Sequence, residues 1–152
     1  MPNHCDQQVY IHGPQPLVDR IHQHLTCKRP EFCQVIVPMP FEHWGASDVV
    51  STGKGLTPMP VWYDWRVDNW GTKWDVCDIE ITSDIEFSKD PDTAWFTFNC
   101  WTAWAPPIPV WQKLHDMGVS VDADYQDEGN MFMGQWLNGE DTCWVPEFKE
   151  EA

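Results

Sequence analysis

The sequence predicts an α+β fold in which a mainly antiparallel sheet carries two main helices on one face. Residues 77–87 and 119–126 alternate apolar and polar side chains with the period of two that is typical of half-buried strands. Residues 16–24 and 110–117 space their apolar side chains as amphipathic helices do. A chain of 152 residues fits one domain, so we expect residues 1–152 to form a single domain.

The first part of the chain predicts a β-α-β unit. Residues 5–12 alternate in polarity and end at a Gly-Pro pair, which predicts a strand. The helix over residues 16–24 follows, and its first residue is a proline, which suits the first turn of a helix. Residues 33–37 are a short apolar run closed by a proline, which predicts a second strand.

An insertion is expected over about residues 38–70. Residues 38–61 are rich in proline, glycine and serine, which predicts a long excursion of the kind that is often functional. Trp62 to about Asn69 is expected to form a short helix, and Gly71 is expected to end it.

The remaining elements complete the order β-α-β, insertion, β-β-α-β. The segment Asp90-Pro91-Asp92 is a turn signal between the strand at 77–87 and a strand at 93–101, so these two should form a hairpin. The second main helix and the strand at 119–126 follow, and one or two short strands are expected between residues 131 and 145. This order favours a ferredoxin-like sandwich with an insertion.

The charge balance limits what the chain can bind. It has 9 Lys and Arg against 24 Asp and Glu, which gives a net charge of −15. Direct contact with nucleic acid or with an anionic membrane surface needs basic residues, so neither is expected. The charge is compatible with two interpretations: solubility alone, or an acidic face that docks on a basic partner.

The sequence also suggests a cellular compartment. It has no apolar run long enough for a membrane helix, and its start, MPNHCDQQVY, lacks the regions of a signal peptide, so a cytoplasmic protein is expected. The six cysteines form no CxxC pair and are expected to be reduced. No histidine or cysteine spacing typical of a metal site occurs, and we expect no metal and no cofactor.

Four segments together resemble a known family. They are MPNHCDQQVYIHGP, VIVPMP, YDWRVDNWGTKWDV and FNCWTAWAPPIPV, and they cover nearly the whole chain. They resemble the Api92-like family, also called the YubB ferredoxin-like domain family, which phages and conjugative plasmids encode. Members usually begin MPNWC, whereas this chain has His4 at the position of that tryptophan. The resemblance implies a ferredoxin-like fold and an accessory role on a mobile element, and it implies no catalytic residues.

Two strands predict rows of carboxylates on the solvent face of the sheet. Alternate residues of a strand are spaced by about 6.5–7 Å on one face. The rows contain acids and no lysine, and regularly spaced anions are also what nucleic acid offers to its binding proteins. The residues expected on this face are Asp78, Glu80, Asp84, Glu86, Asp122 and Asp124.

Tryptophans predict a second candidate surface. Seven of the 11 tryptophans fall between Trp62 and Trp104, and Trp44 lies just upstream. Those of the NWGTKWD segment are compatible with two interpretations, a structural corner and a binding site, and an aromatic platform suits a protein partner. The candidates are Trp70, Trp74, Trp101 and Trp104.

These observations lead to one hypothesis and two alternatives. The hypothesis is a non-enzymatic protein, monomeric or homodimeric, that inhibits a basic nucleic-acid-binding defence complex of the host, of the anti-CRISPR or anti-restriction type, by nucleic-acid mimicry. The first alternative is a protein-interaction module that uses the tryptophan surface. The second is an enzyme that processes nucleotides or nucleic acid near Asp64, Asp68 and Asp75, where aromatic neighbours could raise carboxyl pKa values.

Overall fold

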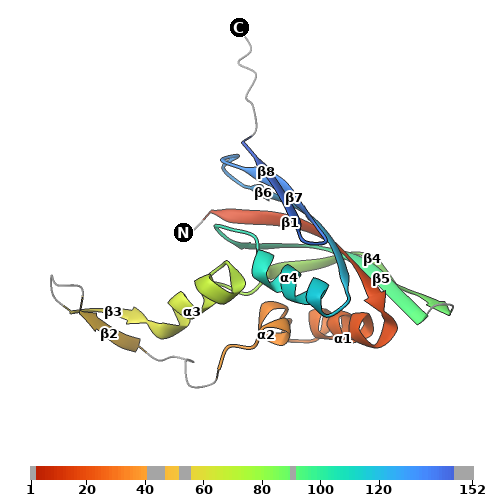
Figure 1. Cartoon of the computed structure of the whole chain (residues 1–152), viewed down its shortest axis with the longest axis horizontal. Coiled ribbons are helices and arrows are strands. Elements are labelled where there is room, and N and C mark those ends of the chain that lie inside the picture. The colour runs from red at the N-terminus through yellow and green to blue at the C-terminus, as the bar shows by residue number, and fades with distance from the viewer. Residues whose placement is uncertain (1–2, 41–46, 52–55, 90–91, 146–152) are drawn as a thin grey trace, which may run out of the picture.

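The chain folds around one six-stranded antiparallel sheet (Figure 1). The computed structural model describes residues 3–40, 47–51, 56–89 and 92–145. The strand order across the sheet is β4-β5-β1-β6-β7-β8. The strands are β1 (His4–Pro14), β4 (Cys77–Lys89), β5 (Asp92–Ala103), β6 (Ser120–Asp127), β7 (Met133–Leu137) and β8 (Glu140–Trp144).

Helices cover one face of this sheet, and the described residues leave most of the other face open (Figure 1). The helices are α1 (Gln15–Thr26), α2 (Cys33–Ile36), α3 (Val61–Trp70) and α4 (Ile108–Asp116). The α+β class, the hairpin of β4 and β5, and the helices α1, α3 and α4 are therefore as predicted. None of the described helices is both long and apolar enough to cross a bilayer.

The core lies between the sheet and the helices. Strand β5 contributes Phe96 and Phe98, and β1 contributes Val9 and Ile11, all of them buried. Helix α1 buries its apolar stripe against this layer, as helical spacing requires. Trp111 of α4 is fully buried, with its ring centroid 6.0 Å from that of Trp136 and 6.3 Å from that of Tyr125.

The predicted strand at residues 33–37 is wrong, because this segment forms the short helix α2. The Asp75 carboxylate accepts hydrogen bonds from the backbone N–H groups of Phe32, Cys33 and Gln34 at 3.1, 2.8 and 3.0 Å. A carboxylate at a helix N-terminus satisfies free N–H groups and complements the helix dipole. The helix is thus stabilised by a residue about forty positions away, and the apolar run alone predicted the other outcome.

The predicted excursion contains a small sheet of its own. Strands β2 (Ser47–Ser51) and β3 (Leu56–Pro60) pair antiparallel, and they lead into α3 (Figure 1). Trp44 lies outside the described residues. Gly71 follows α3 with a φ of +78°, and its N–H bonds to the Val67 carbonyl at 3.1 Å, so it ends the helix as expected.

Candidate binding face

The open face of the sheet is organised in rows that cross the strands. Residues directly opposite each other in an antiparallel pair point to the same face. The first row therefore contains Trp101, Asp6, Gln126, Met133 and Trp144, in the order β5, β1, β6, β7, β8. The second row contains Glu80, Asn99, Gln8, Asp124 and Gln135, in the order β4, β5, β1, β6, β7.

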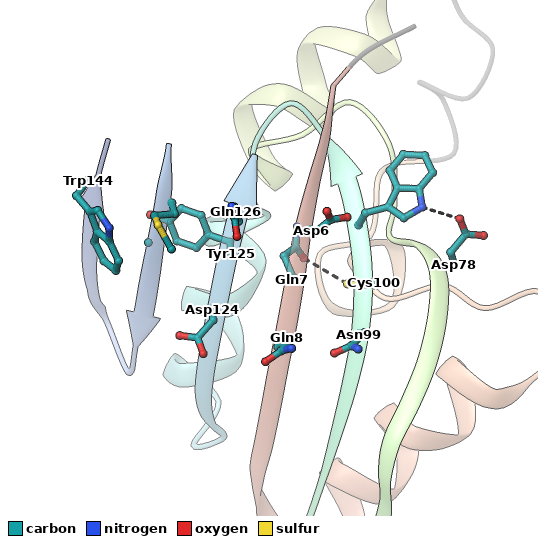
Figure 2. Close-up of a pocket in the computed structure, with 13 residues that line it drawn as sticks. Asp6, Gln7, Gln8, Asp78, Asn99, Cys100, Asp124, Tyr125, Gln126 and Trp144 are labelled. Atoms are coloured by element: carbon teal, nitrogen blue, oxygen red, sulfur yellow. Dashed lines mark hydrogen bonds between the residues drawn. The ribbon is translucent and has the colours of Figure 1, made fainter. Parts of the chain in front are cut away.

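The first row, together with Asn99, Gln8 and Asp124 of the second, lines a hollow of about 570 Å³ on the open face. Figure 2 shows Asn99, Gln8 and Asp124 on three neighbouring strands, with Trp144 at one end of the hollow and Asp78 at the other. A second hollow of about 330 Å³ shares Gln8, Asn99 and Asp124 with the first and continues toward Tyr10. The two hollows together form a groove across the middle of the sheet.

Carboxylates dominate the charge of this face. The six strands of the sheet contain a single lysine or arginine, Lys89, which is the last residue of β4. Lys89 pairs with Asp92, at the far end of the hairpin from the hollow. The acids that the register or a hydrogen bond places on the open face are Asp6, Asp78, Glu80, Glu86, Asp122 and Asp124.

Two of these acids are fixed beside tryptophan rings. The Trp101 indole Nε1 donates to Asp78 Oδ2 at 2.6 Å, and the Trp95 Nε1 donates to Glu86 Oε2 at 3.1 Å. Asp78 has a φ of +50° at a shift in the β4–β5 register, so backbone irregularity turns it toward Trp101. Each pair sets a negative charge at the edge of an aromatic ring.

Asp84 is not part of the acidic face. Its Oδ1 lies 3.0 Å from His22 Nε2 on α1, which packs on the covered side of the sheet. Register shifts between Ile81 and Ser83 and between Ser83 and Glu86 break the alternation of β4. The predicted row of four acids on this strand is therefore reduced to Asp78, Glu80 and Glu86, because bulges change which face each residue points to.

The structure separates the four candidate tryptophans. Trp70 is buried, and its Nε1 donates to the Val37 carbonyl at 2.7 Å, so it belongs to the core. Trp74 contacts Trp101 edge to face, with centroids 6.3 Å apart. Trp104 is 47% exposed, and the Lys73 ammonium lies 4.2 Å from its ring centroid and 4.9 Å from that of Trp74. Trp74, Trp101 and Trp104 thus form one aromatic cluster at the end of the groove.

His4 joins this cluster. Its ring stacks on Trp101 with centroids 3.5 Å apart and an angle of 10° between the planes. Its Nδ1 lies 3.7 Å from Glu128 Oε2. The imidazole therefore adds a flat aromatic contact to the cluster of Trp74, Trp101 and Trp104.

The acids proposed for an enzyme do not converge. Asp64 and Asp68 lie on exposed positions of α3, whereas Asp75 has four backbone N–H groups on its carboxylate: the three of α2 and that of Val76 at 2.7 Å. Among the described residues no group of three His, Cys, Asp or Glu is placed to hold a metal ion. All six cysteines are free. Burial raises the pKa of Cys5 to about 12 and also raises the pKa of Cys33 and Cys100.

Sequence reasoning missed half of the groove. Asp6, Gln8, Asn99, Gln126 and Trp144 all line it and were not candidates. The signal was present for the first two, because they alternate with the apolar residues of the first strand. The others become neighbours only through the strand order, which alternation along one strand does not show.

Comparison with known proteins adds no assignment. No family model, curated protein or solved structure matches the chain.

Asp124 allows a direct test of the electrostatics of the groove. Partial burial, and then the neighbouring Asp122 carboxylate, raise the pKa of Asp124 above its ordinary value. Asp122→Asn should therefore lower the pKa of Asp124 part of the way toward that value. A carbon-detected NMR titration measures it, and Asp68→Asn, far from the groove on α3, should leave it unchanged. An Asp124 pKa that does not move in Asp122→Asn contradicts this account.

The raised pKa of Asp124 also makes the stability of the fold depend on pH. Because the folded-state pKa of Asp124 lies above the unfolded value, ionised Asp124 lowers stability at neutral pH, and this cost disappears as the pH falls through the folded-state pKa. On acidification Asp124 therefore loses its negative charge at a higher pH than an ordinary aspartate does.

Proposed function

We propose that this chain is a non-enzymatic inhibitor that docks its open sheet face on a basic, nucleic-acid-binding surface of a host protein. The observation that carries the proposal is the charge of that face: six carboxylates on three strands, with Lys89 the single lysine or arginine of the sheet's described strands and outside the groove. A surface of this sign attracts a basic groove over long range and speeds the encounter.

The arrangement of the acids supports mimicry of a nucleic-acid backbone. Neighbouring strands are about 4.8 Å apart and alternate residues about 6.5–7 Å apart, so carboxylates on β1, β4 and β6 sample a two-dimensional array of anions. Proteins that bind nucleic acid place lysine and arginine against regularly spaced phosphates. A host defence complex that is the target of an anti-CRISPR or anti-restriction protein presents such a surface.

The fold and the family enter the proposal as support. We infer a ferredoxin-like arrangement, because β1, α1, β4, β5, α4 and β6 follow the βαββαβ order and stand in the sheet as β4-β5-β1-β6. The strands β7 and β8 extend this unit at one edge. The resemblance to the Api92-like family points in the same direction, toward a protein encoded by a mobile element and acting in the host cytoplasm.

The test compares two charge-reversed variants with the native chain. The first replaces Asp6, Glu80 and Asp124 with lysine; in the described part of the chain these three side chains accept no hydrogen bond, so the fold should persist. The matched control replaces the exposed acids Glu31, Asp68 and Asp116 with lysine, which gives the same net charge.

Each protein is used to capture partners from host lysate at low and at high salt. We expect a basic nucleic-acid-binding complex to be captured at low salt, lost at high salt, and bound at least about tenfold more weakly by the groove variant than by the control. Equal capture by both variants would overturn the proposal.

A second candidate function is a protein-interaction module built on the aromatic cluster. It is favoured by the 47% exposure of Trp104 beside Trp74 and Trp101. Binding through such apolar side chains persists at high salt, and it should be lost on Trp104→Ala but not on charge reversal in the groove.

A further inference from the structure

We propose that the larger hollow of the groove receives the side chain of an arginine from the partner protein. This inference depends on the proposed function, since it names the group that a basic partner would insert. The hollow lies on the open face, with Asp78 at one end and Trp144 at the other (Figure 2). Trp101, which donates a hydrogen bond to Asp78, also lines it.

The negative charge of the hollow favours a cationic side chain. Asp6, Asp78 and Asp124 all line the hollow, and no lysine or arginine is among its described lining residues. Asp78 is bonded to Trp101, whereas the described part of the chain gives Asp6 and Asp124 no hydrogen-bond donor for their side chains. A cation inserted here would meet two carboxylates, those of Asp6 and Asp124, that are available to accept its hydrogen bonds.

The spread of hydrogen-bond acceptors in the hollow favours a planar cation over a compact one. Three amides, those of Gln8, Asn99 and Gln126, lie among the carboxylates of the hollow and offer additional carbonyl acceptors. A guanidinium has five N–H donors in a fixed plane, so it can use several acceptors at once, whereas an ammonium is a compact and strongly hydrated charge. Acceptors spread across three strands therefore favour arginine over lysine.

Two tryptophan rings that line the hollow also favour arginine. Guanidinium groups stack on tryptophan faces, and the chain already uses this contact internally. The Arg66 guanidinium lies 5.0 Å from the Trp62 ring centroid and 4.8 Å from that of Trp70. In the hollow, Trp101 and the 46% exposed Trp144 are the corresponding rings; Trp101 lies opposite Asp6 in the strand register, and Trp144 lies opposite Met133.

The volume fits a side chain together with the segment that carries it. A hollow of about 570 Å³ lies within the range of ordinary binding sites, and the adjoining 330 Å³ hollow gives the neighbouring residues of the partner a place along the sheet. A single arginine at the centre of a basic segment would then act as the anchor of the interface, as buried arginines often do.

The probe is a short, capped, glycine-rich peptide with one central arginine, compared with the same peptide carrying lysine or citrulline. The indole N–H signals of Trp101 and Trp144 in nitrogen-15 NMR spectra report on the two ends of the hollow. We expect the arginine peptide to shift both signals, the lysine peptide to bind about tenfold more weakly, and the uncharged citrulline peptide to have no effect.

Variants locate the contact. Asp6→Asn combined with Asp124→Asn should abolish the shifts, whereas Asp68→Asn combined with Asp116→Asn should leave them unchanged. Equal affinity for the arginine and lysine peptides, shifts produced by citrulline, or shifts confined to other tryptophans would each overturn the inference. The comparison among the three peptides uses the native chain, so it stands even where a variant fails to fold.

The two proposals fail differently. A basic partner captured in a groove-dependent manner, with no arginine preference in the peptide experiment, leaves the proposed function intact and removes the arginine site. Arginine-specific shifts at Trp101 and Trp144, with no basic nucleic-acid-binding partner captured, keep the site and remove the proposed function.

Discussion

Replacing Asp75 with alanine is expected to destabilise the protein by about 3 kcal/mol. One carboxylate accepts four backbone N–H groups, three from the start of α2 and one from Val76, at distances between 2.7 and 3.1 Å. A hydrogen bond to a charged group contributes about 1.5–3 kcal/mol, and the alanine would leave several donors unsatisfied at once. The loss therefore exceeds the 0.5–2 kcal/mol that is typical of an ordinary helix cap.

Urea unfolding followed by tryptophan fluorescence measures this loss as a lower midpoint. Asp75→Asn keeps the shape and one acceptor oxygen and should recover part of the stability. Asp68→Ala, on the exposed side of α3, is the matched control and should have almost no effect. An unchanged midpoint in Asp75→Ala would show that α2 does not depend on this carboxylate.

Gly134→Ala is expected to destabilise the protein by about 3 kcal/mol. A Cβ atom at this position of β7 would collide with the ring and hydroxyl of Tyr125 and come within 2.7 Å of the Thr142 carbonyl oxygen. Overpacking in a filled core costs about 1–3 kcal/mol, and here the obstacle includes backbone that cannot rotate away. Tyr125 crosses β7 at this glycine and donates its hydroxyl to Asp141 of β8, so the collision would also disturb the strand pair that carries Trp144.

A double-mutant cycle isolates this contact. In a Tyr125→Ala background, most of the obstacle is gone, and Gly134→Ala should cost clearly less than in the native chain. Thermal unfolding of the native chain, the two single variants and the double variant, all at one protein concentration, gives the four free energies of unfolding that the cycle needs. Additive costs would mean that Tyr125 and Gly134 are not in contact.

The regular elements of the fold could be predicted because their signals are local. Apolar spacing along α1 and α4 and strict alternation along β5 and β6 each reflect one face packed on the core. The hairpin of β4 and β5 followed from its turn residues. These predictions needed no knowledge of which elements become neighbours.

The errors have non-local causes. The apolar run at residues 33–37 becomes helical because Asp75, far along the chain, bonds to its N–H groups. Asp84 leaves the acidic row because β4 is bulged against β5, and a bulge is a property of the strand pair. Trp70 is buried through its bond to Val37, which nothing in the NWGTKWD segment indicates.

The candidate site was predicted in part for the same reason. Asp78, Glu80, Glu86, Asp122 and Asp124 were expected on one face and are found there. The groove between them exists because β1 lies between β5 and β6 and brings Asp6 and Gln8 into the centre of the face. Strand order decides this, and strand order depends on how the two crossover helices pack.

The central position of β1 also affects how the molecule is made. This strand is synthesised before the other strands of the sheet, yet His4 pairs with Ala103 and Cys5 with Asp127, so neither neighbour exists until β5 and β6 have been synthesised. Contacts between distant parts of a chain slow folding and keep apolar strands exposed in the meantime. The sheet therefore closes late, after synthesis of β6, and a nascent chain that stops before residue 120 would leave Val9 and Ile11 without their second strand.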